Sequence, residues 1–219
     1  LDRRLGIGGD QLLLVRPSRE ADFAMAIRNA DGSQAEMCAN GIRAFTKYVR
    51  DKGLTRKDVI RVETLAGIVT PRWLGGDQVE VEMTRPVLEP AKIPTLLGGR
   101  APLIDVPLEV GGERLSVCAV GMGNPHCVVF VDDPDAFPVE RIGKLIEHHS
   151  AFPERVNVEF VGVRSRGELV QRTWERGSGE TLACGSGACA VGVAAVLSGR
   201  AERDVRIRLR GGVLRIRWP

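Results

Sequence analysis

The strongest constraint on the fold is a pattern that occurs twice: a polar, glycine-containing loop, then a cysteine, then a predicted helix. The first copy covers residues 29–43 and carries Cys38, and the second covers residues 175–188 and carries Cys184. A chain that repeats such a unit at this separation is expected to contain two domains built on one plan. Length supports this, because 219 residues suffice for one domain or two.

The helix after each cysteine is predicted to be hydrophobic. Residues 187–197 include no charged side chain, which indicates a helix buried on all sides, and Gly199 ends it. Predicted strands flank both helices, so each domain should wrap strands around one central hydrophobic helix. The sequence therefore predicts an α/β (α+β) fold of two pseudo-symmetric domains, residues 1–85 and 86–219, with several prolines marking the passage between them.

The remaining elements are predicted from the spacing of apolar residues. After Cys38, the helical spacing within residues 42–51 comes from Ile42, Phe45, Tyr48 and Val49. A second, surface helix is expected over residues 139–149. Strands are expected at 23–27, 59–63, 67–70, 78–83, 115–120, 127–131, 156–163 and 169–174, with a hairpin over 204–218.

Composition excludes several classes of protein. Hydrophobic residues make up 43% and charged residues 27%, as in ordinary globular proteins, and no apolar run is long enough to span a bilayer. The net charge of +3 is dispersed, and the alternating arginines of residues 206–217 fit the solvated face of strands, so neither nucleic acid nor membrane is an expected partner. Five cysteines without a Cys-x-x-Cys pair argue against disulfides and zinc, and favour a reducing cytoplasm.

The two matching cysteines are the candidate catalytic groups. A thiol at a helix N-terminus faces backbone N–H groups and the positive end of the helix dipole, which should lower its pKa from about 8.5 and make it available as a base. Two such thiols on opposite sides of one carbon could remove a proton from one face and return one to the other. A lone cysteine is usually a small buried hydrophobe, and that interpretation is kept for Cys118, Cys127 and Cys189, which lack such loops.

The motifs resemble those of diaminopimelate epimerases, in the same order and at similar spacings over nearly the whole chain. They are Asn-x-Asp-Gly-Ser-x-x-x-x-Cys-x-Asn-Gly-x-Arg, Gly-Asn-Pro-His, Val-Asn-Val and Glu-Arg-Gly-x-Gly-Glu-Thr-x-Ala-Cys-Gly-Ser-Gly-Ala. The resemblance implies two pseudo-symmetric domains with the active site in the cleft between them. It also implies interconversion of LL- and meso-2,6-diaminopimelate, without a cofactor, in lysine and cell-wall precursor biosynthesis.

The resemblance also implies roles for particular residues. Cys38 and Cys184 would be the acid and base, and His126 and Glu175 would assist them or bind the α-ammonium group. Substrate contacts would come from Gln11, Asn29, Ala39, Asn40, Asn124, Asn157, Glu175, Arg176, Gly185 and Ser186. Backbone N–H groups at the two helix starts could stabilise the substrate carboxylate, although a Gly-Ser-Gly helix start could equally hold a phosphate.

Some features leave alternatives open. Ala39 stands where the family usually has glycine, and the family has further segments before Leu1 and after Pro219, the latter with dimer contacts, so a homodimer is expected if such segments are present. The alternatives are a racemase or epimerase for proline, hydroxyproline, histidine or glutamate, and a catalytically inactive, ligand-binding relative. No lysine lies in a glycine-rich loop that suggests pyridoxal phosphate, and no residue cluster has metal-ligand spacing.

Overall fold

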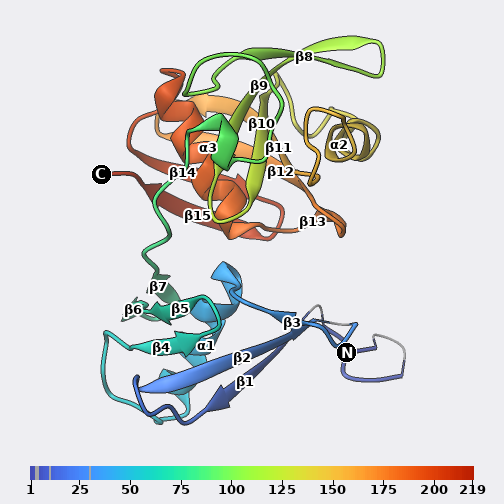
Figure 1. Cartoon of the computed structure of the whole chain (residues 1–219). Coiled ribbons are helices and arrows are strands. Elements are labelled where there is room, and N and C mark those ends of the chain that lie inside the picture. Colours follow the sequence, from blue (N-terminus) through green and yellow to red (C-terminus); the bar gives the residue numbers. More distant parts are fainter. Residues whose placement is uncertain (3–4, 10, 30) are drawn as a thin grey trace. The chain divides into compact units, whose positions relative to one another are not determined.

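The computed structural model describes residues 1–2, 5–9, 11–29 and 31–219 (Figure 1). The chain forms two compact units, Leu1–Glu82 and Met83–Pro219. The predicted boundary lay between residues 85 and 86, near the end of the last hairpin of the first unit. Within the described residues, no helix is long and apolar enough to cross a membrane.

The first unit is a small mixed sheet with one helix. Its elements are β1 (Gln11–Arg16), β2 (Phe23–Asn29), β3 (Gln34–Ala35), α1 (Ala39–Asp51), β4 (Val62–Thr64), β5 (Gly67–Val69), β6 (Arg72–Gly75) and β7 (Gln78–Glu80). The sheet has the order β1-β2-β4-β5, with β3 also paired to β2, while β6 and β7 form a separate hairpin. Because α1 connects β2 to β4, these two strands run parallel.

Helix α1 is amphipathic, which differs from the predicted hydrophobic helix. Ile42, Phe45 and Val49 pack against residues of β2 and β4 in the core of this unit. Tyr48, predicted to share that face, is 49% exposed, because it lies on the side of the helix that carries the charged residues.

The second unit is larger and is built on one mixed sheet. Its elements are η1 (Pro90–Lys92), β8 (Val106–Val110), β9 (Glu113–Gly121), β10 (Pro125–Phe130), α2 (Val139–Glu147), β11 (Asn157–Ser165), β12 (Glu168–Glu175), β13 (Gly179–Thr181), α3 (Gly185–Leu197), β14 (Asp204–Leu209) and β15 (Gly212–Arg217). The strand order is β15-β14-β12-β11-β10-β9-β8, with β13 paired to β12.

The two helices of this unit cover opposite faces of the sheet. Side chains alternate between faces along a strand, and β9 shows this directly, because Ala119 lies in the α2 core while Cys118 lies in the α3 core. Helix α3 contacts the three neighbouring strands β9, β10 and β11 and also β15, which lies at the far end of the strand order, so the sheet curls around it (Figure 1). This helix is apolar and buried, as the absence of charge over residues 187–197 predicted.

Both units contain the same local topology. A strand ends at the polar loop, a short strand folds back on it, the cysteine follows, and the helix leads to a strand parallel to the first. In the first unit this is β2-β3-α1-β4, and in the second it is β12-β13-α3-β14. The predicted mixed α/β class with two sheet-rich units is therefore confirmed.

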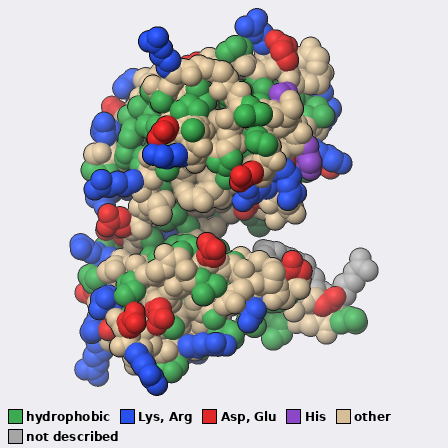
Figure 2. All heavy atoms as spheres, viewed as in Figure 1, with side chains coloured by type: hydrophobic (Ala, Val, Ile, Leu, Met, Phe, Trp, Pro, Cys, Tyr) green, Lys and Arg blue, Asp and Glu red, His purple; other side chains and the backbone are tan. Residues whose placement is uncertain are grey.

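Most predicted elements are present with shifted ends. The predicted strand at 59–63 is regular only from residue 62, since Val59 makes a single bridge to Arg72, and strand β8 had not been predicted. On the face drawn in Figure 2, Lys and Arg side chains are dispersed over each unit, with Asp and Glu among them.

Candidate active site

The predicted site residues form one group in each unit. The Cys38 half-site consists of Gln11, Asn29, Cys38, Ala39 and Asn40. The Cys184 half-site consists of Asn124, His126, Asn157, Glu175, Arg176, Cys184, Gly185 and Ser186. Each group draws on at least two strands of its sheet and on the first turn of the helix.

Cys38 is the N-cap of α1. Its backbone is extended (φ −140°, ψ 112°), and its Sγ accepts a hydrogen bond of 3.3 Å from the Gly41 N–H. This is the arrangement in which Ser or Asp usually caps a helix, with sulfur in place of oxygen. Ala39 and Asn40 begin the helix, so their N–H groups belong to the turn that points away from the helix body.

The loop before Cys38 is held by its own polar side chains. Asn29, the last residue of β2, is paired with Gln11 of β1, and the Gln11 Nε2 donates to the Asn29 Oδ1 over 2.9 Å. Asp31 accepts hydrogen bonds from both the N–H and the hydroxyl of Ser33, which holds the pKa of its carboxyl below the usual value. Ala30 of this loop lies outside the described residues.

Cys184 repeats the cap geometry in the second unit. Its backbone is extended (φ −122°, ψ 117°), and its Sγ accepts from the Gly187 N–H at 3.4 Å and lies 3.5 Å from the Ser186 hydroxyl. A side chain at position 187 would not fit, because an added Cβ would lie against the Glu159 carboxylate. The prediction that each cysteine opens a helix is confirmed for both.

The expected acidification of Cys184 is wrong for this structure. Burial, together with the negative charges of Glu175 and Glu159, raises the pKa of the Cys184 thiol to about 12, against the lowering effect of the hydrogen bonds from Ser186 and Gly187. The helix N-terminus therefore acts in the predicted direction but is outweighed by desolvation and like charge. In the structure Cys184 is a thiol, the form that can donate a proton.

Glu175 ends β12 directly before the second loop. The Thr181 hydroxyl donates to the Glu175 Oε1 over 2.5 Å, across the hairpin of β12 and β13. The negative charge of this carboxylate is one of the causes that raise the pKa of Cys184. The sequence predicted Glu175 as a helper of the cysteine, and this placement is compatible with that role.

His126 lies inside the unit, between two side chains. Its Nδ1 is 2.9 Å from the Glu159 Oε1 and its Nε2 is 2.8 Å from the Asn124 Oδ1, and both His126 and Glu159 are fully buried. Sequence reasoning missed Glu159. The available signal was a charged residue in the apolar run of β11, two positions after Asn157, where its side chain points to the same face of the sheet.

Asn157 and Arg176, both predicted as substrate contacts, contact each other in the structure. The Asn157 Oδ1 accepts from the Arg176 N–H at 3.0 Å, and its Nδ2 donates to the Pro125 carbonyl at 3.0 Å. The Arg176 guanidinium donates to the Glu154 carbonyl. The Asn157 amide thus ties β10 to the loop after β12, in addition to any contact with substrate.

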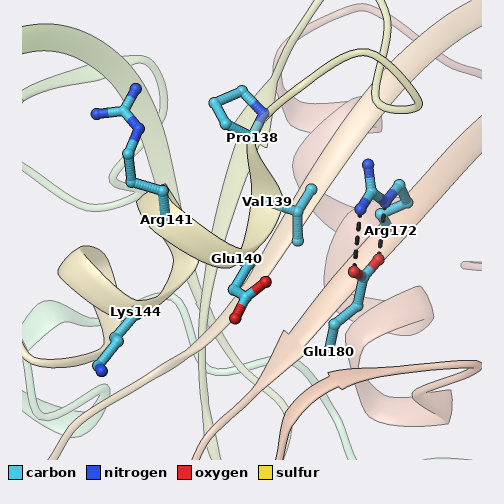
Figure 3. A pocket seen from close by; sticks show the side chains of 7 residues that line it. All are labelled: Pro138, Val139, Glu140, Arg141, Lys144, Arg172 and Glu180. Carbon is cyan, nitrogen blue, oxygen red and sulfur yellow. Dashed lines mark hydrogen bonds and ion pairs between the residues drawn. The ribbon is translucent and has the colours of Figure 1, made fainter.

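A surface hollow of about 560 Å³ lies in the second unit, between α2 and the hairpin of β12 and β13 (Figure 3). It is lined by Pro138, Val139, Glu140, Arg141, Lys144, Arg172 and Glu180, and among the described residues no predicted site residue lines it. Arg172 and Glu180 face each other in Figure 3, joined by two hydrogen bonds of 2.7 and 2.9 Å. This pair braces β12 against β13 and so supports the loop that carries Cys184.

Known proteins resemble the chain over most of its length. The family profile described as diaminopimelate epimerase matches residues 1–89 and 118–219. The diaminopimelate epimerase of Leptospira biflexa serovar Patoc is 50% identical, with 99% of this chain and 79% of that protein covered. The diaminopimelate epimerase of Moorella thermoacetica is 51% identical, with 99% and 78% covered.

A solved structure shares the fold at low sequence identity. The PhzF-family phenazine biosynthesis protein of Bacillus anthracis aligns with a TM-score of 0.67 and 16% identity, covering 93% of this chain and 72% of that one. At 16% identity, that likeness shows a shared fold alone. The family profile and the two relatives that are 50% and 51% identical show a relationship in sequence. On these grounds, the chain belongs to the diaminopimelate epimerase family.

Proposed function

We propose that this protein is a cofactor-independent isomerase that interconverts LL- and meso-2,6-diaminopimelate. The observation that carries the proposal is the pair of cysteine N-caps, each with its sulfur on the N–H three residues ahead, in a chain of this family. Such a reaction belongs to lysine and cell-wall precursor synthesis. The polar residues of both half-sites would bind the substrate.

The proposed chemistry is a proton exchange at the α-carbon. A thiolate of one cysteine takes the α-proton, the C–H electron pair stays on carbon, and the thiol of the other cysteine delivers a proton to the opposite face. One proton is taken and one is given, so configuration inverts with no net oxidation and no bond to the enzyme. The roles of Cys38 and Cys184 exchange in the reverse direction.

The charged groups of the substrate, its α-ammonium and its carboxylate, would assist this proton exchange. The α-ammonium group of the substrate, placed beside Glu175, offsets one of the negative charges that raise the Cys184 pKa, so binding makes that thiol a better acid. Developing charge on the substrate carboxylate is stabilised by the N–H groups of the first turns of α1 and α3. These turns begin at Ala39 and Gly185.

Turnover of LL-diaminopimelate in deuterated water by reduced protein tests the proposal. The expected result is formation of the meso isomer with deuterium at the inverted α-carbon. Activity confined to proline, hydroxyproline, histidine or glutamate would instead assign a different amino-acid racemase. Absence of both turnover and α-deuterium exchange in folded, reduced protein would identify an inactive, ligand-binding relative.

The proposed action of both thiols on one carbon has its own test. Oxidation of the protein should join Cys38 to Cys184, with loss of activity that reductant reverses, and peptide mapping would identify the bridge. A map that contains only other pairings contradicts the two-thiol arrangement. Cys189, a free cysteine within α3, is the internal reference for oxidation outside the proposed pair in the same map.

The proposal extends to compartment and assembly. All five cysteines are free thiols, which suits a reducing cytoplasm, and a homodimer follows from the family resemblance. Cell fractionation and light scattering of the purified protein measure these two properties. A monomer with full turnover would remove the dimer from the proposal and leave the chemistry in place.

A further inference from the structure

One buried carboxylate outside the predicted site, that of Glu147, directly contacts residues 174 and 177, on either side of the candidate site residues Glu175 and Arg176. Glu147 is the last residue of α2, and only 3% of it is exposed. Its Oε2 accepts from the indole N–H of Trp174 over 2.7 Å, and its Oε1 accepts from the Gly177 N–H over 2.8 Å. The Arg155 guanidinium lies 3.5 Å from the same Oε1 and supplies a compensating charge.

These contacts enclose the two candidate site residues of the loop. Trp174 directly precedes Glu175, and Gly177 directly follows Arg176, so one carboxylate holds the chain on both sides of that pair. Gly177 has a φ of +78°, a conformation that side chains other than glycine rarely adopt, and its N–H points at Glu147 in that conformation.

Neighbouring contacts fix the same segment from other directions. The N–H of Arg176 is held by Asn157 of β11, so two successive amides are bound by side chains of two different elements. The Trp174 side chain packs against α2 at Gly143, where an added Cβ would come within 2.7 Å of it. The loop is therefore fastened to α2 as well as to the sheet.

A carboxylate is a costly choice for this position if packing were its only purpose. Helix α2 otherwise presents Val139, Ile142 and Ile146 to the core, and an apolar side chain at 147 would continue that face. A buried charge is retained where its hydrogen bonds specify one geometry among several. The geometry specified here is that of the Glu175–Arg176 segment.

We propose that Glu147 is a positioning residue for the reaction: its two oxygens clamp Trp174 and Gly177, and thereby hold Glu175 against Cys184 and Arg176 toward the substrate. This inference rests on the proposed function for the reaction it serves. Glu147 itself touches no reacting atom. Displacement of a reacting group by about 1 Å can cost about 10²-fold in rate, so the clamp has a measurable effect.

The variant Glu147→Gln tests the clamp, because the amide keeps the size of the side chain but has one accepting oxygen for the two N–H donors of Trp174 and Gly177. Its Nε2 would face either the indole N–H or the Gly177 N–H. We expect kcat to fall about 10- to 100-fold, the KM to rise as Arg176 shifts, and the pH profile to move with the Glu175–Cys184 distance. The exposed Glu140→Gln, on the same helix, is the matched control and should leave these values unchanged.

A second variant separates positioning from folding. Trp174→Phe removes one of the two donors, so the double variant Glu147→Gln/Trp174→Phe can point its amide oxygen at Gly177 and should regain part of the lost kcat. Hydrogen exchange at the Arg176 and Gly177 amides should accelerate in Glu147→Gln and slow again in the double variant. Circular dichroism and the melting temperature report the folded fraction at each step.

The outcomes are distinguishable. A folded Glu147→Gln protein with the kcat, KM and pH profile of the parent, or with unchanged exchange at Gly177, overturns the clamp. A loss that disappears once the folded fraction is accounted for also overturns it and leaves Glu147 a purely structural residue. Failure of the proposed function shows instead in the parent protein, as absence of diaminopimelate turnover, while the exchange measurement still decides whether Glu147 holds the loop.

Discussion

Cys38 and Cys184 cap their helices in the same way, yet their surroundings differ. In both, an extended cysteine accepts the N–H three residues ahead at 3.3 to 3.4 Å. Cys38 is half-buried and stands on an amphipathic helix, whereas Cys184 is buried, stands on an apolar helix and has two carboxylates for neighbours. The cap alone therefore does not set the state of the thiol.

On the proposed mechanism, this difference would let one backbone motif serve two proton-transfer roles. In the first unit the loop's carboxylate, Asp31, is bound by Ser33. In the second unit Glu175 and Glu159 act on the thiol itself and help to raise its pKa to about 12. Burial and charge thus favour the protonated form of Cys184, and on the proposed mechanism the ammonium group of the substrate offsets part of that charge.

Removing either thiol should have the largest effect. Cys38→Ser and Cys184→Ser replace a group that exchanges protons with one that is far less acidic, so epimerisation should fall by about 10² to 10⁴-fold in each. Turnover and α-deuterium incorporation measure this loss. Cys189→Ala is the matched control, since Cys189 lies on α3 outside the cap, and it should keep the parental rate. Turnover in Cys38→Ser equal to that of the parent protein would contradict the proposal that both cysteines take part in the reaction.

The sequence predicted the caps well because cap chemistry is local. A polar loop, a cysteine and the start of a helix lie within fifteen residues, and this order placed Cys38 and Cys184 at helix starts. The pKa of Cys184 could not be predicted in this way, because Glu159 comes from another strand and because burial depends on the whole sheet that curls around α3. Glu147 was missed for the same reason, since only the packing of α2 brings it to Gly177.

The two cap glycines should differ in their tolerance of a methyl group. An added Cβ at Gly187 would overlap the Glu159 Oε1, whereas one at Gly41 would meet the Cys38 Sγ and the Leu13 side chain at 3.2 Å. Glu159 is buried against His126 and has little room to move. Gly187→Ala should therefore lower the free energy of unfolding by about 1–3 kcal/mol, and Gly41→Ala by less. Urea denaturation of both variants measures the difference, and equal losses would contradict it.

Charge near Cys184 should control its rate of alkylation. Below a pKa of about 12 the thiolate fraction, and with it the rate, rises with pH by about tenfold per unit. Of the two carboxylates, Glu175 raises the Cys184 pKa more than Glu159 does. Glu175→Gln should therefore lower the Cys184 pKa and accelerate its alkylation at a fixed pH. Mass spectrometry of iodoacetamide-treated protein measures the rate at each cysteine. Cys189, whose pKa is raised by burial alone, should react as in the parent.

The smallest effect is expected at the residues that follow the caps. The Ser186 hydroxyl lies 3.5 Å from the Cys184 Sγ and lowers its pKa, so Ser186→Ala should raise that pKa and slow alkylation by a few-fold. Its counterpart Asn40 accepts a hydrogen bond from the Arg43 guanidinium, and we expect Asn40→Ala to change the alkylation of Cys38 by less than Ser186→Ala changes that of Cys184. An effect of Asn40→Ala on Cys38 as large as that of Ser186→Ala on Cys184 would mean that both caps are tuned alike. The contrast between the half-sites would then rest on burial and the carboxylates alone.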